Sequence, residues 1–373
     1  MEKRLIIEQF DPERPIPGGV DTCIRGLVQY CPPDIDLRVA GVDAIGNKTV
    51  GVWAEHQIGG RKFQFMPLAR IDYANLQRAI PHSVWIAKAL LKFRPAPEAD
   101  VIQTHRINTG AVALQLYRNA RHVQFIHVEN ELKNGSQSFF RYAAFSYRWL
   151  EKYVIPRTVD TVVFNTVGAQ RLRGIAEQVR FSPTWYDGSQ FFPPATEAVA
   201  KTRIIWACRI EPGKNPQLAV DVIAALPEHY TLTIAGSGTM EPFMREYARS
   251  STAASRIHFA GEVPKAEVGE VMRQHDLMLM TSKSEGFSRS IVEGLASGLP
   301  VVTTSAGEPN GLVQTGVNGA RVDGFAPSLF VPAVEIAAKL SAIAASQSVA
   351  HLEVTSIVPD VLTIPRPPNQ RSK

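Results

Sequence analysis

Two glutamates, Glu285 and Glu293, stand at the ends of a predicted turn and helix. Gly286, beside the first, allows a chain leaving a strand to turn tightly, and Gly298 with Pro300 ends the helix that carries the second. A helix that starts directly after a strand presents free N–H groups and its positive dipole end, which suit an anion. Carboxylates accept hydrogen bonds from hydroxyl groups. The stretch therefore predicts a sugar-nucleotide site. One glutamate would bind the sugar on each side of the diphosphate. The alternative is that both glutamates are solvated surface residues.

Two cations follow another predicted strand, Arg203–Cys208. Arg209 and Lys214 bracket a Pro-Gly turn, and Asn215 opens the next helix. A diphosphate at this turn would meet two positive groups and a helix N-terminus. The alternative is a surface turn with exposed cations, which is common in proteins.

Glycines follow two further strands. Gly18 and Gly19 come after the first strand and open a helix, where paired glycines allow close backbone approach to a ligand. Gly236 begins a turn that resembles a dinucleotide fingerprint, but the third glycine position holds Glu241. We therefore expect a turn near the site and no nicotinamide cofactor.

Histidines end two short apolar strands. His127 follows one and could donate to a sugar hydroxyl or a phosphate, and His105 has a similar setting. A histidine at a strand end is more often structural, so both interpretations remain open. Glu129 and Glu131 are weaker candidates for acid–base catalysis.

Strand-length apolar runs alternate with amphipathic segments, which favours parallel sheets with helices on both faces. The alternation is interrupted over 183–202 and then restarts, so we predict an α/β fold of two doubly wound, Rossmann-like domains that face a central cleft. The domains are 1–195 for the acceptor and 196–350 for the donor, with a tail of 351–373 that crosses back or is disordered. The clearest predicted strands are Arg4–Gln9, Asp100–His105, His122–Val128, Arg203–Cys208, Tyr230–Ala235, Ile257–Ala260, Leu277–Met280 and Val301–Thr304.

Length and composition agree with two domains. The chain has 373 residues, and single cores stop growing near about 250–300 residues. No apolar run approaches the ~18 residues of a membrane span, and the start lacks a signal-peptide core, so a cytoplasmic protein is expected. The three cysteines are scattered without metal-ligand spacing, which argues against a zinc site and a disulfide framework.

Charge is uneven along the chain. Residues 1–195 hold 24 Lys+Arg against 18 Asp+Glu, and the remainder holds 16 against 17. The aromatic segment 138–157 also carries a stripe of Arg141, Arg148 and Lys152. Peripheral contact with an anionic membrane is one interpretation, and core packing with cations extended to solvent is the other. No nucleic-acid recognition motif is present.

Taken together, these motifs resemble the retaining glycosyltransferases of family 4, which have the GT-B fold. The likeness runs from Arg4 to about Val322 and is strongest in the stretches 209–214 and 285–302. The resemblance implies that Glu285 contacts the donor sugar and Glu293 the ribose, that Arg209 and Lys214 hold the diphosphate, and that His127 reaches the donor sugar. It further implies donor contacts at Gly18, Gly19, Val263, Gly286, Phe287, Ser288 and Arg289. The turn at Gly236 is expected near the same site and is a further candidate for donor binding.

The chain departs from the family pattern in places. Ser288 stands where the family has glycine, and the segment 307–311 replaces its Gly-Gly-x-x-Glu. The family's final helix, which returns to the first domain, is not evident after Ser346.

The resemblance predicts an enzyme that transfers a hexose from a UDP- or GDP-sugar to a hydroxyl of a glycan or glycolipid, with retention and in cell-surface polysaccharide synthesis. No metal or other cofactor is expected, because the cations and the helix N-terminus would stabilise the leaving diphosphate. A nucleotide-sugar epimerase and a catalytically inactive sugar-nucleotide-binding protein are the alternatives.

Overall fold

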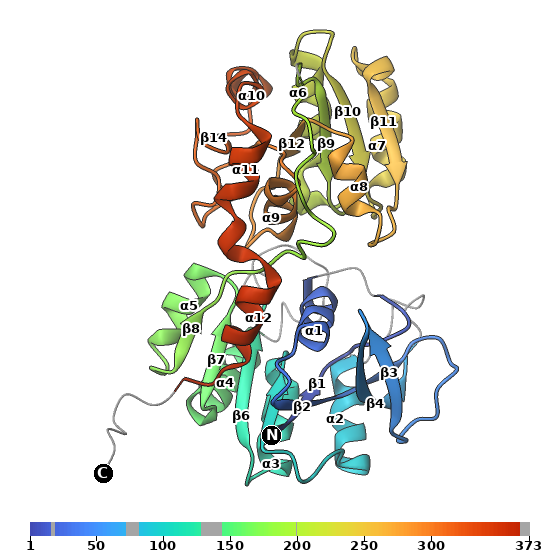
Figure 1. The fold of residues 1–373 in the computed structure, drawn as a ribbon, viewed down its shortest axis with the longest axis vertical. Coiled ribbons are helices and arrows are strands. Elements are labelled where there is room, and N and C mark those ends of the chain that lie inside the picture. Colours follow the sequence, from blue (N-terminus) through green and yellow to red (C-terminus); the bar gives the residue numbers. More distant parts are fainter. Residues whose placement is uncertain (16–18, 72–81, 128–143, 199, 366–373) are drawn as a thin grey trace. The chain divides into compact units, whose positions relative to one another are not determined.

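The computed structural model describes the whole chain except residues 16–18, 72–81, 128–143, 199 and 366–373. It forms two compact units (Figure 1). Unit 1 is Met1–Pro183 with Thr355–Lys373, and unit 2 is Thr184–Val354. Each unit is a Rossmann-like α/β domain built on its own sheet.

The sheet of unit 1 has the strand order β3-β4-β2-β1-β5-β6-β7-β8. Its neighbouring strands are parallel, apart from the antiparallel pair β3 and β4. Because β2 and β5 lie on opposite sides of β1, the topological switch point falls between β1 and β5. The strands are β1 Glu2–Ile7, β2 Ile35–Asp43, β3 Ala54–Ile58, β4 Arg61–Arg70, β5 Val101–Thr104, β6 Arg121–Ile126, β7 Asp160–Val163 and β8 Val179–Phe181.

Helices cover both faces of this sheet. One buried cluster joins Leu5 and Ile7 of β1 to α2 and α3, and another joins β6, β7 and β8 to α3, α4 and α5. Side chains alternate along a strand, so Arg4 lies on the opposite face, where its guanidinium donates to the carbonyl of Leu362 in α12 at 2.6 Å. The helices are α1 Gly19–Gln29, α2 His82–Phe93, α3 Ile107–Leu116, α4 Ala144–Val154, α5 Thr166–Arg173 and α12 Val354–Leu362.

Unit 2 has a six-stranded parallel sheet in the order β11-β10-β9-β12-β13-β14. Its switch point lies between β9 and β12, because the chain runs outward from β9 on one side and from β12 on the other. The strands are β9 Arg203–Ala207, β10 Thr231–Ala235, β11 Ile257–Gly261, β12 Leu277–Met280, β13 Val301–Thr304 and β14 Gly319–Val322.

The core of unit 2 packs α6, α7 and α10 against one face, around Trp206, Leu279 and Phe330. Helix α9 packs on the other face, where a Cβ on Gly294 would lie 2.4 Å from the sulfur of Met278. The helices are α6 Pro216–Ala225, α7 Glu241–Arg249, α8 Val268–Arg273, α9 Arg289–Ala296, α10 Phe330–Ala338 and α11 Ala342–Ser348.

The unit boundaries differ from those expected at 195 and 350. Unit 2 begins at Thr184, within the interruption at 183–202 that we interpreted as an interdomain linker. Trp185, Tyr186 and Phe191 of this stretch are buried. Tyr186 also pairs with the returning chain, donating to the Leu352 carbonyl at 3.2 Å and accepting from the Val354 amide at 2.9 Å. The stretch 184–191 is therefore part of unit 2 and not a free connector.

A helix does follow Ser346, contrary to the interpretation that none is evident. It is α12, which begins at Val354 and lies in unit 1 from Thr355 onward. Pro359 within it and its β-branched residues hide the helical pattern in the sequence. Arg180 holds this helix by donating to the carbonyls of residues 360, 361 and 363.

The eight clearest predicted strands are all present, with ends shifted by a few residues. The aromatic segment 138–157 is described only from Ala144, where α4 begins, and Arg141 lies outside the described residues. Among described helices, none alone has the length and apolar character to cross a membrane; the pair Pro327–Ala338 and Ala342–Ser348, bent by 99°, meets that criterion only jointly.

Candidate functional site

The candidate site of unit 2 lies at the carboxyl edge of its sheet. The stretch 208–215 follows β9, and the stretch 281–288 follows β12. These two strands are neighbours and flank the switch point, where open α/β sheets bind ligands. The fold therefore brings together the two motifs that the sequence places about 70 residues apart.

Thr281 joins these two loops. Its fully buried hydroxyl donates to the carbonyls of Lys214 at 2.9 Å and Asn215 at 3.0 Å, and accepts from the indole N–H of Trp206 at 2.9 Å. A further backbone bond runs from the Lys283 amide to the Gly213 carbonyl at 2.9 Å. These hydrogen bonds hold the 208–215 loop against the 281–288 loop.

Lys214 forms an ion pair with Glu285, and both side chains are largely buried. Glu285 also accepts from the hydroxyl of Ser282 at 2.7 Å. Arg209 is exposed, and its guanidinium makes no ion pair within the described part of the chain. One predicted diphosphate contact is therefore neutralised in this structure by the predicted sugar contact, while the other faces solvent.

The segment 307–311 supports the Glu285 loop from the next strand. The side-chain amide of Asn310 donates to the Gly286 carbonyl at 2.5 Å, and the buried carboxylate of Glu308 accepts from the amides of Asn310 and Val313. Thr304 adds a bond to the Ser282 carbonyl at 2.6 Å. Asn310, Thr304 and Thr281 could not be predicted as supporting residues, because their contacts depend on strand order.

Helix α9 begins directly after the 281–288 loop. Ser288 is its N-cap residue, but the hydroxyl makes no capping bond, so the first amides of α9 stay available.

Arg289 donates to Thr184 at 3.0 Å and pairs with Glu293 at 3.4 Å. Burial raises the pKa of Glu293, although Arg289 and Lys265 oppose the shift. Phe287 lies half-buried between Gly286 and this helix start.

Glycine at position 236 is required by geometry. Its φ is 142°, and a Cβ there would lie 2.1 Å from the carbonyl oxygen of Cys208. The turn after β10 therefore packs directly on the cationic loop, and Ile210 bonds to Ser237 at 2.9 Å. Val263 lies half-buried just after β11, at the same edge of the sheet.

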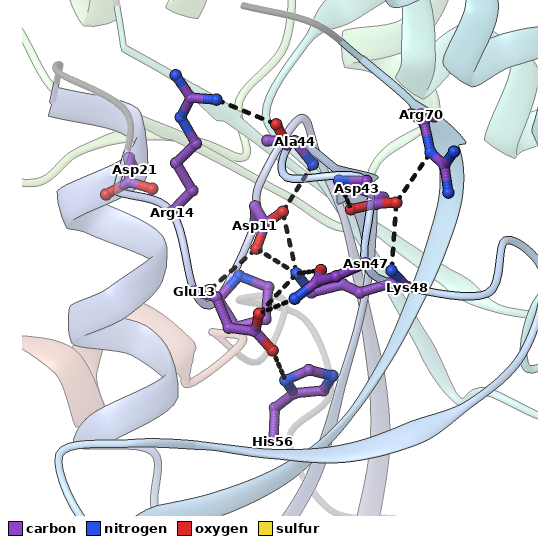
Figure 2. A network of polar contacts seen from close by, with 12 residues as sticks. Asp11, Glu13, Arg14, Asp21, Asp43, Ala44, Asn47, Lys48, His56 and Arg70 are labelled. Atoms are coloured by element: carbon purple, nitrogen blue, oxygen red, sulfur yellow. Dashed lines mark hydrogen bonds and ion pairs between the residues drawn. The ribbon is translucent and has the colours of Figure 1, made fainter.

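In unit 1, the loops after β1 and β2 carry a polar network (Figure 2). The buried ammonium of Lys48 lies 3.1 Å from both Asp11 and Glu13, and Asp11 also accepts from the Ala44 amide at 2.7 Å. Arg25 of α1 donates to the carbonyls of Pro12 and Asp11. The network fixes residues 11–14, which lie between β1 and α1, and α1 begins at Gly19. Gly18 lies outside the described residues.

His105 and His127 follow β5 and β6, and their rings are hydrogen bonded at 2.8 Å. The side-chain sulfur of Cys23 on α1 lies within 4.8 Å of one ring nitrogen of each histidine. The sequence spacing of the cysteines gave no sign of this cluster, because three separate elements supply it. Glu129 and Glu131 lie outside the described residues.

Part of unit 2 matches a known protein family. Residues 201–339 match the family described as Glycosyl transferases group 1. A D-inositol 3-phosphate glycosyltransferase from Xylanimonas cellulosilytica is 25% identical over 169 residues, which cover 40% of this chain and 40% of that protein. The similarity thus spans less than half the length of the curated relative.

Solved structures match over nearly the whole chain. Sucrose-phosphate synthase from Thermosynechococcus elongatus has a TM-score of 0.78 at 17% identity, covering 97% of each chain. HepE from Anabaena, in complex with UDP and glucose, has a TM-score of 0.69 at 17% identity, covering 97% of this chain and 98% of that one.

These findings define a GT-B protein of two Rossmann-like domains. The match to the family described as Glycosyl transferases group 1 lies within unit 2. The predicted GT-B fold is confirmed.

Proposed function

We propose that this protein is a retaining glycosyltransferase that moves a hexose from a UDP- or GDP-sugar to a hydroxyl of a glycan or glycolipid. The observation that carries the proposal is the junction of the 208–215 and 281–288 loops through Thr281, at the switch point of a glycosyl transferases group 1 domain. These loops carry Arg209, Lys214 and Glu285 at one edge of the sheet, and Glu293 follows on α9. Such a set of groups suits an anion flanked by sugars.

In this proposal the leaving diphosphate binds Arg209, Lys214 and the amides that begin α9. Glycosyl transfer develops negative charge on that group, and preorganised positive groups stabilise it most. Lys214 must then exchange Glu285 for phosphate oxygen, which frees the carboxylate to accept from a sugar hydroxyl. Glu293 would accept from the ribose. The cations supply the charge stabilisation that a metal ion gives in other transferases, so we propose metal-independent transfer.

Retention of configuration would follow from a front-side route. The leaving phosphate takes the proton of the acceptor hydroxyl as the new glycosidic bond forms on the same face. A double displacement would need a carboxylate nucleophile close to the anomeric carbon. Glu285 is proposed as a sugar contact instead, because the hydroxyl of Ser282 donates to its carboxylate and holds it in place.

The acceptor and location are extensions of the same proposal. HepE was solved with UDP and glucose, which supports a UDP-hexose donor. We propose a cytoplasmic enzyme of cell-surface polysaccharide synthesis, with peripheral membrane contact through the basic unit 1. Trp149 of α4, 60% exposed, is the described side chain best suited to such contact.

A donor panel tests the function. Purified protein is incubated with UDP- and GDP-hexoses, with and without glycan and lipid-linked acceptors and with a chelator. We expect transfer or slow donor hydrolysis that the chelator leaves unchanged. Arg209→Ala and Lys214→Ala should each lower kcat/KM by about 10²–10³-fold, whereas the exposed Arg249→Ala should not. Release of an epimerised sugar, or binding without turnover, would refute transfer, and unchanged kinetics in both variants would refute the diphosphate assignment.

A further inference from the structure

Four polar side chains form a continuous hydrogen-bonded chain along one face of the sheet of unit 1. Arg4 Nη1 lies 3.4 Å from Gln103 Oε1, Gln103 Nε2 lies 2.9 Å from His105 Nε2, and His105 Nδ1 lies 2.8 Å from His127 Nε2. The first three side chains are at least nine-tenths buried, with exposed fractions of 1%, 0% and 6%. Hydrogen bonds in such a dry environment are strong, and an unmatched donor or acceptor is costly.

The two imidazole rings meet edge to edge in one plane. Their centroids are 5.1 Å apart, and their planes differ by only 10°. A nitrogen–nitrogen contact of 2.8 Å at that separation requires both nitrogens to lie on the line between the ring centres. Each nitrogen therefore points at the other, which is the geometry of a hydrogen bond and not of two ligands converging on one metal ion.

The direction of every bond in the chain follows from its first member. A guanidinium only donates, so Gln103 receives Arg4 on its oxygen and presents its amide nitrogen to His105. An amide nitrogen only donates, so Nε2 of His105 accepts. The proton of a neutral His105 must then be on Nδ1, from which it is donated to Nε2 of His127.

His105 stays neutral under ordinary conditions. Burial lowers its pKa to about 3, and the nearby positive charge of Arg106 acts in the same direction. The ring of His105 also packs against Phe125, with centroids 4.9 Å apart. Its single proton therefore has a fixed position and a fixed orientation.

We propose that His105 is a positioning residue that holds the proton of His127 on Nδ1. With Nε2 occupied as an acceptor, Nδ1 is the one ring nitrogen of neutral His127 that carries a hydrogen. The ring of Phe164, nearly parallel at 4.7 Å, fixes the plane of His127 and so the direction of that N–H.

The functional consequence rests on the proposed glycosyl transfer. His127 would then offer an N–H donor to an oxygen of the donor sugar, and its other nitrogen would be unable to act as a proton acceptor. The tautomer itself does not depend on that activity, so the two claims can fail separately.

The test is nitrogen NMR of the whole chain labelled with ¹⁵N-histidine, with His127→Gln used to assign the His127 signals. We expect an unprotonated Nε2 and a protonated Nδ1 on His127. A protonated Nε2 in the wild-type protein would overturn the proposal.

Two matched substitutions of His105 test the direction of its hydrogen bond to His127: one should preserve it and the other should reverse it. His105→Asn keeps a donor near the position of Nδ1 and should preserve the His127 tautomer. His105→Asp presents only acceptors and should move a proton onto Nε2 of His127. Gln103→Glu is a second route to the same reversal, and Arg4 beside it offsets the buried charge. Identical His127 spectra in the Asn and Asp variants, or in wild type and Gln103→Glu, would overturn the proposal.

Kinetics and metal binding complete the test. If transfer is observed, kcat/KM for the donor should fall at least about tenfold in His105→Asp relative to His105→Asn, the loss of one hydrogen bond. Stoichiometric Co²⁺ should give no thiolate charge-transfer band. A thiolate–Co²⁺ charge-transfer band that disappears in Cys23→Ser would show that the ring nitrogens of His105 and His127 serve as metal ligands. That result would overturn the proposed positioning role of His105.

Discussion

The ammonium of Lys214 and the carboxylate of Glu285 form an ion pair that links the loop after β9 to the loop after β12. Each residue was assigned to a different part of the same ligand, one to the diphosphate and one to the transferred sugar. Their contact shows that the two parts of the proposed site are adjacent within unit 2. In the proposed function, donor binding replaces this pair.

Glu285→Gln should separate nucleotide binding from turnover. The substitution removes a negative charge beside the proposed diphosphate and releases Lys214, so UDP or GDP should bind about fivefold more tightly, equivalent to about 1 kcal/mol. Transfer should nevertheless slow, because the sugar loses a charged acceptor. Calorimetric titration with the nucleotide measures the first effect, with the exposed Glu228→Gln as control. Weaker nucleotide binding in Glu285→Gln would contradict the arrangement.

Thr281→Val should lower the stability of the protein and weaken donor binding. It leaves the buried indole N–H of Trp206 without an acceptor and removes the bonds to the carbonyls of Lys214 and Asn215. We expect a loss of about 1–3 kcal/mol in the free energy of unfolding, measured by urea denaturation, together with a higher KM for the donor. Thr252→Val, at an exposed position, is the control and should change neither quantity. A wild-type KM in the destabilised Thr281 variant would show that the hydrogen bonds of Thr281 do not position the donor site.

Donor affinity should depend on pH through Glu293. Burial raises the pKa of this carboxyl above its usual value of 4.5. Only the ionised form offers all its oxygens as acceptors, so affinity should be full above the raised pKa and fall as pH decreases through it, by about tenfold for one charge-assisted bond. Binding the donor should accordingly release protons in this range.

The matched variant for this pH effect is Glu293→Gln. It should bind the donor weakly at every pH, which calorimetry in buffers of different ionisation enthalpy would measure. A variant with the wild-type pH profile would exclude Glu293 as its source.

Gly236→Ala should be far more damaging than Gly316→Ala. Both glycines have positive φ, but a Cβ at Gly316 meets nothing within 4 Å, whereas one at Gly236 collides with the Cys208 carbonyl. We expect a cost of about 1–2 kcal/mol at Gly316 from backbone strain alone, and at least about 3 kcal/mol at Gly236. Thermal unfolding of both variants measures the difference. Equal costs would mean that the turn after β10 can move away from the cationic loop.

Periodicity and local turn chemistry were enough to predict the two α/β units. The strands around Leu5, Ile204 and Leu279 are short apolar runs, and each is followed by a turn and an amphipathic segment, so local pattern and final structure agree. Helix α12 was missed because Pro359 breaks its local pattern, and packing of the helix in unit 1 compensates. The boundary at Thr184 was missed because a Pro-rich, aromatic stretch is typical of a linker, although tertiary packing buries it.

By itself, the sequence determined which residues could bind a sugar nucleotide: Arg209, Lys214, Glu285 and Glu293 stand in turns after strands, and residue type and local spacing are properties of the chain. Only the tertiary structure decided which of these residues meet. Strand order makes β9 and β12 neighbours, so Thr281 clamps the cationic loop and Glu285 pairs with Lys214. Strand order likewise places His105 beside His127, and burial fixes the proton between them. Hydrogen-bond direction and pKa depend on neighbours distant in sequence, which the chain specifies only after it has folded.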